Sequence, residues 1–285
     1  MKDAYQTSSK SELDSISLSR ERAHHDKWAS QVETDNIDVD KFFEASTAPE
    51  NRFILEKLGD IRGKSILDLG CGIGESSVYF AKQGGICTAA DYSPGMLEVA
   101  MKVAEKNGVS IKTAVTNAMD IKMEDNSFDI VYAANLLHHV EPEKALMEIH
   151  RVLKPGGKAC FWDPLKHNPI INIYRRMASE VRSEDEHPLD IKILDFIRSI
   201  FKEVEFDTFW LCTLWIFLRF YLIERVNPND ERYWKKIIYD EERIRNRYLF
   251  LEKIDKCLKK LIPFSRRYAW NIAVVATKQT SASKS

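Results

Sequence analysis

The sequence predicts an α/β fold: a mostly parallel, Rossmann-like sheet with a final antiparallel strand and helices on both faces. Three observations point to it. A short apolar strand over residues 65–69 is followed by a glycine-rich turn and then a helical pattern. Further short apolar strands alternate with amphipathic helical stretches over residues 86–163. The 285 residues suffice for one large domain with added segments.

The composition restricts the function classes. Charges nearly balance, with 42 Lys and Arg against 43 Asp and Glu, which favours neither an overall nucleic-acid binder nor a disordered acidic chain. Five cysteines occur without a C-x-x-C pair, so we expect buried free thiols in a cytoplasmic protein and no metal site. Residues 1–20 lack the apolar core of a secretory signal, and no apolar run of about 18 residues could span a membrane.

The N-terminal region is expected to be a frayed polar tail over residues 1–15, followed by amphipathic helices up to Leu58. We expect Asn51 to cap the last of these helices and Gly59 to end it.

The first strand leads into a turn with three glycines, Gly70-x-Gly72-x-Gly74. Glycine lets the backbone adopt positive φ and lets a ligand approach the main chain, and the next helix points its free N–H groups there. A dinucleotide-binding turn would instead have the pattern G-x-G-x-x-G. With Asp68 before it, the turn resembles motif I of the class I S-adenosylmethionine-dependent methyltransferases, in which no pyrophosphate has to be held.

The second strand, residues 86–90, ends in Asp91, and an acidic side chain there can accept hydrogen bonds from both ribose hydroxyls of a nucleoside. Ser93 is expected to cap the following helix, with Pro94 in its first turn. The segment D-Y-S-P-G-M-L resembles the second signature of the same family, in which Tyr92 and Met96 would flank the adenosine. Met96 could equally be a core residue.

A third strand is expected over residues 110–116, followed by the turn Asn117-Ala118-Met119-Asp120. In the resembled family this turn contacts the adenine. Met119 fits the packing role, and either Asn117 or Asp120 could supply the polar contact.

The fourth strand, residues 128–133, is followed by Asn135 and by His138-His139. Ligands bind at the carboxyl ends of the central strands of open α/β sheets, so these residues should lie beside the reacting centre. The two histidines are candidate general bases, because imidazole titrates near neutral pH, although both could be structural. A helix that ends at residues 153–157 and a fifth strand over residues 158–162 complete this part.

Residues 63–163 together resemble the core of a class I methyltransferase of the broad small-molecule type. The resemblance implies S-adenosyl-L-methionine as cofactor. It also implies an N-terminal helical lid lined by His24, His25 and Trp28, unless these are surface histidines and a packed tryptophan. The Asn/Asp-Pro-Pro-aromatic motif of DNA amino-methylating enzymes does not follow the fourth strand, which argues against DNA as a substrate. The resemblance to class I methyltransferases implies the following cofactor-binding residues: Asp68, Gly70, Cys71, Gly72, Gly74, Asp91, Tyr92, Met96, Asn117, Ala118, Met119 and Asn135.

The division of the chain follows from where the family pattern stops. We expect a helix over residues 189–201, a sixth strand over 204–209 and a final antiparallel strand over 269–276. The expected parts are a tail with lid helices (1–62), a core (63–211 and 267–278) with an insertion over the substrate pocket (164–188), and a helical cap (212–266).

The cap region permits two arrangements. Residues 209–223 are almost entirely apolar, and residues 253–261 alternate apolar and basic positions at helical spacing. Such a pair could lie on a membrane surface, or it could be a cap buried against its own domain with a solvated basic face. Both arrangements predict an apolar pocket beneath the cap.

The sequence therefore predicts an enzyme that transfers a methyl group to a small, lipophilic or aromatic acceptor, which could be a lipid. The alternatives are a catalytically silent S-adenosylmethionine-binding adaptor and an RNA methyltransferase, the latter based only on the basic C-terminal third. We expect a cytoplasmic protein, or one peripheral to the membrane. The sequence leaves open the acceptor atom, the substrate and the oligomeric state.

Overall fold

The computed structural model describes residues 22–23, 25–34, 37–178 and 186–280. The polar tail expected over residues 1–15 lies outside this part. The strands are β1 (Ser65–Leu69), β2 (Ile86–Asp91), β3 (Lys112–Val115), β4 (Phe128–Ala134), β5 (Leu153–Pro164), β6 (Glu203–Phe209) and β7 (Asn271–Thr277). The helices are α2 (Val39–Glu44), α3 (Pro49–Leu58), α4 (Glu75–Lys82), α5 (Pro94–Lys106), α6 (Pro142–Val152), α7 (Pro169–Met177), α8 (Ile193–Ile200), α9 (Trp215–Leu222), α10 (Tyr233–Tyr239) and α11 (Glu241–Leu261), with short 3-10 helices η2 (Leu137–His139), η4 (Cys212–Leu214) and η5 (Pro263–Tyr268).

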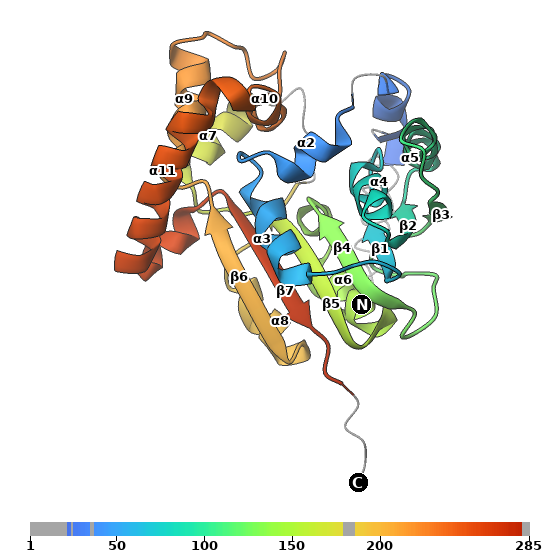
Figure 1. Cartoon of the computed structure of the whole chain (residues 1–285). Helices are drawn as coiled ribbons and strands as arrows, with labels where there is room; N and C mark the ends of the chain where they lie inside the picture. Colours follow the sequence, from blue (N-terminus) through green and yellow to red (C-terminus); the bar gives the residue numbers. More distant parts are fainter. Residues whose placement is uncertain (1–21, 24, 35–36, 179–185, 281–285) are drawn as a thin grey trace, which may run out of the picture.

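All seven strands form one sheet in the order β3-β2-β1-β4-β5-β7-β6 (Figure 1). Strands β1 to β5 pair in parallel, and β7 is antiparallel to both of its neighbours, β5 and β6. The order reverses between β1 and β4, which is where open α/β sheets bind ligands. The predicted fold class is confirmed.

The core consists of two hydrophobic layers, one on each face of the sheet. In β1, Ile66 packs toward α2, α3 and α4, whereas Leu67 and Leu69 pack toward α6 and α8. This alternation is the period of two that a strand imposes on its side chains. Because both faces are covered, the central strands are apolar throughout, as expected for a parallel sheet.

Several predicted element boundaries were wrong. Strand β7 begins at Asn271 instead of residue 269. Strand β5 begins at Leu153, directly after α6, because an irregular register opposite Phe128 and Ile130 lets residues 154–157 join the strand. Strand β3 is shorter than expected at both ends. Helix α8 begins at Ile193, since Leu189 is bridged to Leu165 instead of entering the helix.

The expected cap at Asn51 was also wrong. Helix α3 begins at Pro49, whose fixed φ suits a first helical turn, so Asn51 lies inside the helix. Its buried side chain donates to the Phe42 carbonyl (3.0 Å) and accepts from Tyr132 Oη (2.7 Å) and Trp162 Nε1 (3.1 Å). Asn51 therefore connects the lid helices to β4 and β5. The helix ends at Gly59, as predicted.

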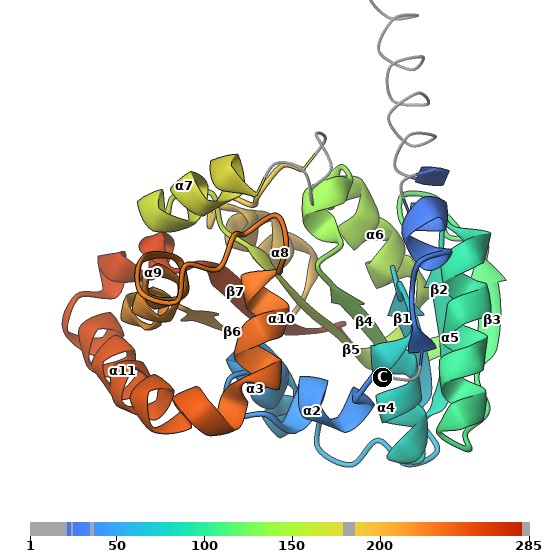
Figure 2. The ribbon, with the colours of Figure 1, turned by 90° about the horizontal axis from the view of Figure 1, so that it is seen from above.

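The elements between β6 and β7 cover one end of the sheet. Figures 1 and 2 show α9, α10 and α11 gathered around β6 and β7 together with α7, which precedes β6 in the chain, while α4 and α5 lie beside β1 to β3. Buried side chains of the cap join the hydrophobic layer that also contains α2 and α3. They are Ile216, Phe217, Phe220, Tyr233, Ile237, Ile244 and Tyr248.

The basic face expected on residues 253–261 is interrupted. Lys259 is 5% exposed and bonds both carboxylate oxygens of Asp207 on β6 at 2.8 Å. Asp255 is equally buried and accepts the backbone N–H of Cys212 at 2.6 Å. Helix α11 therefore carries charged side chains on its buried side as well as on its solvent-exposed side. Among the described residues, no helix has both the length and the apolarity needed to cross a bilayer.

Candidate active site

A cavity of about 330 Å³ lies at the carboxyl ends of the central strands. Its walls come from the helical residues 25–29, from α2 and α3, from the glycine turn after β1 and from the end of β4. The end of β5, Trp210 after β6, the start of β7, residues 171–175 with Glu186, and helix α10 complete it. Segments far apart in the sequence therefore meet at the place where the strand order reverses.

The glycine turn presents an open surface at Gly72. Its φ is 51°, and a Cβ atom added there would meet nothing within 4 Å, so a ligand can approach the backbone closely. The neighbouring Gly74 is constrained instead by packing, because its Cβ would lie 2.5 Å from the Cβ of Ala100 on α5. The two glycines thus serve the ligand side and the helix-packing side of one turn.

Asp91 lies beside this turn, as the sequence predicts. One carboxylate oxygen accepts the N–H of Gly72 (3.0 Å) and the other accepts the N–H of Ser93 (2.9 Å). Burial raises the pKa of Asp91. The side chain is only 8% exposed and is fixed in position by backbone donors at the end of β2.

The cavity brings together only part of the predicted cofactor site. Asp68 lines it, yet its carboxylate accepts a 2.6 Å hydrogen bond from Ser77 Oγ on α4. The other predicted residues in its walls are Gly70, Cys71, Gly72, Asn135, His138 and His139. Those outside its walls are Gly74, Asp91, Tyr92, Met96, Asn117, Ala118 and Met119.

The predicted adenine side lies under the N-terminal segment. Asp26 bonds Ser93 Oγ and accepts the N–H of Gly95 (3.2 Å), and the Arg22 guanidinium lies 5.7 Å from the ring centre of Tyr92. Met96 is completely buried, so it is a core residue whatever else it contacts.

The predicted adenine turn is held by its own hydrogen bonds. Asn117 Oδ1 accepts the N–H of Met119 at 2.9 Å, and Met119 Sδ accepts the N–H of Glu141 at 3.4 Å. Asp120 forms an exposed ion pair with Lys122. Contact of this turn with adenine stays a prediction.

Asn135 has an unusual backbone conformation at the end of β4. Its φ is 52°, a left-handed value that costs a non-glycine residue on the order of 1 kcal/mol. The N–H of Asn135 donates to the Trp162 carbonyl at 2.8 Å, which helps to hold this conformation. Strained backbone of this kind clusters at functional sites, and Asn135 lines the cavity.

His138 is paired with a buried acid that sequence reasoning did not identify. Its Nδ1 lies 2.7 Å from Asp163 Oδ1, and its backbone N–H donates to the same oxygen at 3.2 Å. Asp163 is fully buried near the end of β5, and burial raises its pKa. A carboxylate on Nδ1 fixes the ring orientation and makes Nε2 the acceptor nitrogen of a neutral imidazole. The signal that could have identified Asp163 is its place at the end of the strand beside β4.

His139 and Glu186 lie close to His138. The two histidine rings have centroids 4.0 Å apart, and one ligand atom from each of the three residues lies within 4.8 Å of the others. Imidazole and carboxylate ligands suit divalent transition metals, so this group could hold one. The sequence predicts no metal here, and a chelation experiment decides between the two.

Two of the three residues predicted to line the N-terminal lid lie in the cavity wall. His25 and Trp28 both line the cavity, whereas His24 lies outside the described residues. The Trp28 ring has two cations near it, with Arg232 Cζ at 4.8 Å and Lys235 Nζ at 5.4 Å from its centroid. Burial lowers the pKa of both cations.

The insertion over residues 164–188 contributes Tyr174, Arg175 and Glu186 to the cavity wall. Arg175 donates to the Leu165 carbonyl (3.2 Å) and to Asn172 Oδ1 (2.8 Å). The N–H of His187 donates to the His138 carbonyl at 2.7 Å, so this segment also supports the strand-four end.

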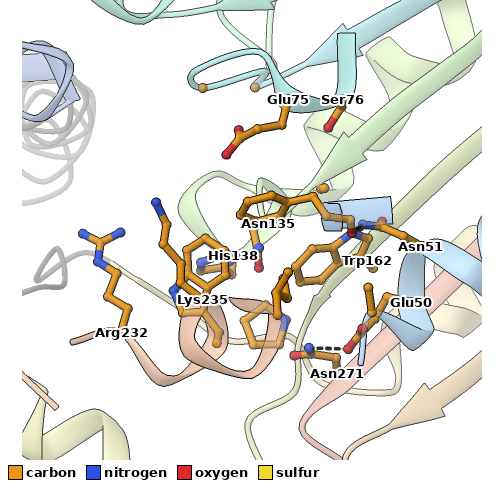
Figure 3. A pocket seen from close by; sticks show the side chains of 18 of the residues that line it. Glu50, Asn51, Glu75, Ser76, Asn135, His138, Trp162, Arg232, Lys235 and Asn271 are labelled. Carbon is orange, nitrogen blue, oxygen red and sulfur yellow. Dashed lines mark hydrogen bonds between the residues drawn. The ribbon is translucent and has the colours of Figure 1, made fainter. Parts of the chain in front are cut away.

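Sequence reasoning did not identify Glu50, which lines the cavity at the end remote from Arg232 and Lys235. It is 5% exposed and accepts hydrogen bonds from Asn271 Nδ2 (2.6 Å) and from the Trp210 side chain. Burial raises the pKa of Glu50 to about 7. Figure 3 shows Glu50 and Asn271 on one side of the cavity, across from Arg232 and Lys235.

Replacing Glu50 by glutamine is expected to stabilise the ligand-free protein at pH 8 and to change little at pH 5. The folded protein keeps the Glu50 proton up to about pH 7, whereas the unfolded chain releases it near 4.5. Unfolding therefore releases a proton in this window, and wild-type stability falls as the pH rises through it. A shift of this size corresponds to up to about 3 kcal/mol. Denaturant unfolding of both proteins at the two pH values measures the difference, and equal differences at pH 5 and pH 8 would show that Glu50 is not buried as described.

Comparison with known proteins places the motifs in context. Residues 67–161 match the family described as "Methyltransferase domain". Phosphoethanolamine N-methyltransferase 2 of Caenorhabditis elegans is 35% identical over 113 residues, which is 38% of this chain and 26% of that protein. O-methyltransferase rstn1 of Aspergillus nomiae is 35% identical over 144 residues, or 49% of this chain and 61% of that protein. The matches thus span less than two thirds of these relatives.

Solved structures share the fold at low sequence identity. Haemonchus contortus phosphoethanolamine N-methyltransferase 2 in complex with S-adenosyl-L-methionine aligns with a TM-score of 0.53 and 19% identity, over 87% of this chain and 61% of that one. The [4+2]-cyclase SpnF aligns with a TM-score of 0.51 and 20% identity, over 81% and 80% of the two chains. These similarities concern the fold alone.

Proposed function

We propose that the chain carries a class I S-adenosylmethionine-dependent methyltransferase domain, because residues 67–161 match the family described as a methyltransferase domain, and that it methylates a small, lipophilic or aromatic acceptor. The observation that carries the proposal is that the glycine turn, Asn135 and His138, which is bonded to the buried Asp163, line one cavity. When bound, S-adenosylmethionine supplies a methyl group already activated on a sulfonium. The protein then has to align the acceptor and exclude water.

The proposed cofactor site starts from the open face of Gly72. Asp91 would accept hydrogen bonds from the ribose hydroxyls. The backbone N–H groups of Gly72 and Ser93 fix its carboxylate beside the glycine turn. The Asn117–Met119 turn and Tyr92 would meet the adenosine. Gly70, Cys71 and Asn135, which line the cavity, would meet the amino-acid end.

His138 is the proposed general base. A hydroxyl or an acidic carbon must lose a proton as it is methylated, and Nε2 of His138 would accept it. Asp163 would act as a positioning residue, since its bond to Nδ1 orients the ring and stabilises the imidazolium that forms.

The acceptor class follows from the walls of the cavity. Aromatic side chains from the lid, the sheet, the insertion and the cap surround it, which favours a flat or lipophilic acceptor. These side chains are Trp28, Tyr132, Trp162, Tyr174, Trp210, Trp234 and Trp270. We propose the corresponding division of the chain into lid (1–62), core (63–211 and 267–278) and cap (212–266).

Methyl transfer from labelled S-adenosylmethionine tests this function against its alternatives. The protein is incubated separately with a metabolite extract, a lipid extract and total RNA. We expect label in the metabolite or lipid fraction. Label only in RNA would favour an RNA methyltransferase, and cofactor binding without transfer to any fraction would favour a silent adaptor, which the same fold could accommodate.

A lipid surface is the proposed partner of the outer cap, since the carboxyl ends of α9 and α11 and the residues that follow them expose large apolar side chains. Exposed fractions reach 65% at Leu222, 67% at Ile223 and 72% at Leu261. Basic side chains nearby, such as Lys260, would favour anionic lipids. We expect flotation with anionic liposomes that is lost in a Leu222→Ser/Ile223→Ser variant. A wild-type protein that stays at the bottom of the gradient would exclude this partner.

A further inference from the structure

The end of the cavity at Glu50 holds an acidic side chain that the proposed methyl transfer does not use. We propose that Glu50 and Asn271 form a binding subsite for a protonated amine on the acceptor, at the end remote from the atom that is methylated. The acceptor would then be an aromatic or lipophilic amine that is recognised by its cationic group. This inference rests on the proposed function and specifies its substrate class.

The Glu50 carboxylate can accept more hydrogen bonds than the protein donates to it. A carboxylate offers about four lone-pair positions, and the protein donors described are Asn271 Nδ2 at 2.6 Å, the Trp210 side chain and the backbone N–H of Glu50 itself. Glu50 lines the cavity, so a donor on a bound molecule can reach the remaining positions. An ammonium group provides up to three donors and the opposite charge.

Within the described residues, the charge of Glu50 has no direct counterion, since Glu50 takes part in no ion pair. The cation two residues away on α3, Arg52, is itself bonded to Glu252 at 2.7 Å. Burying an acid in this way is unfavourable unless a ligand compensates it, and such costs recur at functional sites.

An aromatic surface lies around the Glu50 carboxylate. Trp210 and Trp270 both line the cavity, with ring centroids 6.0 Å apart, and Trp162 lies on the neighbouring strand β5. Aromatic faces attract ammonium groups by cation–π interaction. The site thus combines an anion with the ring surfaces that bind organic cations.

The subsite lies two strands away from the residues proposed to face the methyl donor. Asn135 and His138 follow β4, whereas Asn271 begins β7, two strands away in the order β4-β5-β7. Adjacent strands are about 4.8 Å apart, so the two ends of the acceptor would be separated by roughly 10 Å. The cations Arg232 and Lys235 lie on the other side of the cavity from Glu50, so the positive charges do not compete for the same end (Figure 3).

Isothermal titration of S-adenosylhomocysteine-saturated protein tests the subsite without requiring turnover. The probes are tyramine, 4-ethylphenol and 3-(4-hydroxyphenyl)propionate, which share a phenol and differ in carrying an amine, no charge or a carboxylate. We expect wild type to bind tyramine about 10- to 100-fold more tightly than 4-ethylphenol, as one charge-assisted hydrogen bond would give. The carboxylate should bind most weakly.

The variant Glu50→Gln keeps the shape of the side chain and should reduce the tyramine preference to within about threefold. Glu56→Gln is the matched control, since Glu56 is an exposed acid on the same helix, and it should keep the full preference. Circular dichroism establishes that both variants are folded. Equal binding of tyramine and 4-ethylphenol by wild type, a preference that survives Glu50→Gln, or binding of none of the probes would each overturn the subsite. If tyramine binds as expected but no acceptor is ever methylated, the proposed function fails and the subsite stands.

Discussion

Replacing His138 by alanine is expected to lower kcat by about 10²- to 10⁴-fold, the usual contribution of a general base. The affinity for S-adenosylmethionine should stay within about threefold of wild type, because the side chain is assigned to the acceptor's proton and not to the cofactor. Turnover and cofactor affinity are measured on the same preparation, by labelled transfer and by calorimetry. Retained turnover would remove His138 from the base role.

The neighbouring histidine provides the matched control. His139→Ala should lower kcat less than about tenfold, because the carboxylate that orients a base is bonded to His138 at 2.7 Å. Asp163→Asn should fall between the two, because the imidazole loses the carboxylate that orients it and stabilises its protonated form. If His139→Ala and His138→Ala are equally inactive, and EDTA treatment also abolishes turnover of wild type, the pair would be metal ligands with Glu186.

Replacing Asp91 by alanine is expected to weaken S-adenosylmethionine binding by at least about 10²-fold. Two hydrogen bonds from ribose hydroxyls to a carboxylate would be lost, each contributing about 1.5 to 3 kcal/mol. Calorimetric titration of the cofactor measures the change. The carboxylate also bonds the N–H groups of Gly72 and Ser93, so the glycine turn itself would lose support.

Two further variants separate binding from folding in this experiment. Asp91→Asn retains an oxygen acceptor for one of the two backbone donors and should weaken cofactor binding by at least about tenfold, because the charge and one acceptor are lost. Asp60→Ala removes an exposed carboxylate that is bonded to Arg62 and should leave the affinity unchanged. Wild-type affinity in folded Asp91→Ala would contradict the ribose assignment.

The fold could be predicted from the sequence because its signals are local. Strands β1, β2 and β4 are short apolar runs bounded by turn residues, and the glycine turn and Asp91 follow two of them directly. Local patterns failed where competing signals lay close together. Pro49 started α3 before Asn51 could cap it, and an irregular register carried β5 through a proline-glycine segment.

The acceptor side of the site could not be predicted, because its pairs join distant parts of the chain. Asn271 and Glu50 are separated by 221 residues, and Asp163 and His138 by 25. Helical spacing likewise could not show that Lys259 turns inward, since that depends on Asp207 on β6. The methyl-donor half of the site therefore follows from motifs, and the acceptor half follows only from tertiary packing.

A structure of the protein with S-adenosylhomocysteine bound tests the central claim most directly. The ribose hydroxyls should bond Asp91, and the sulfur should enter the cavity beside Asn135 with its free side toward His138. Open volume should remain between the sulfur and Glu50 for the acceptor. A ribose bound away from Asp91, or a ligand that fills the space between His138 and Glu50, would contradict the claim that donor and acceptor share this cavity.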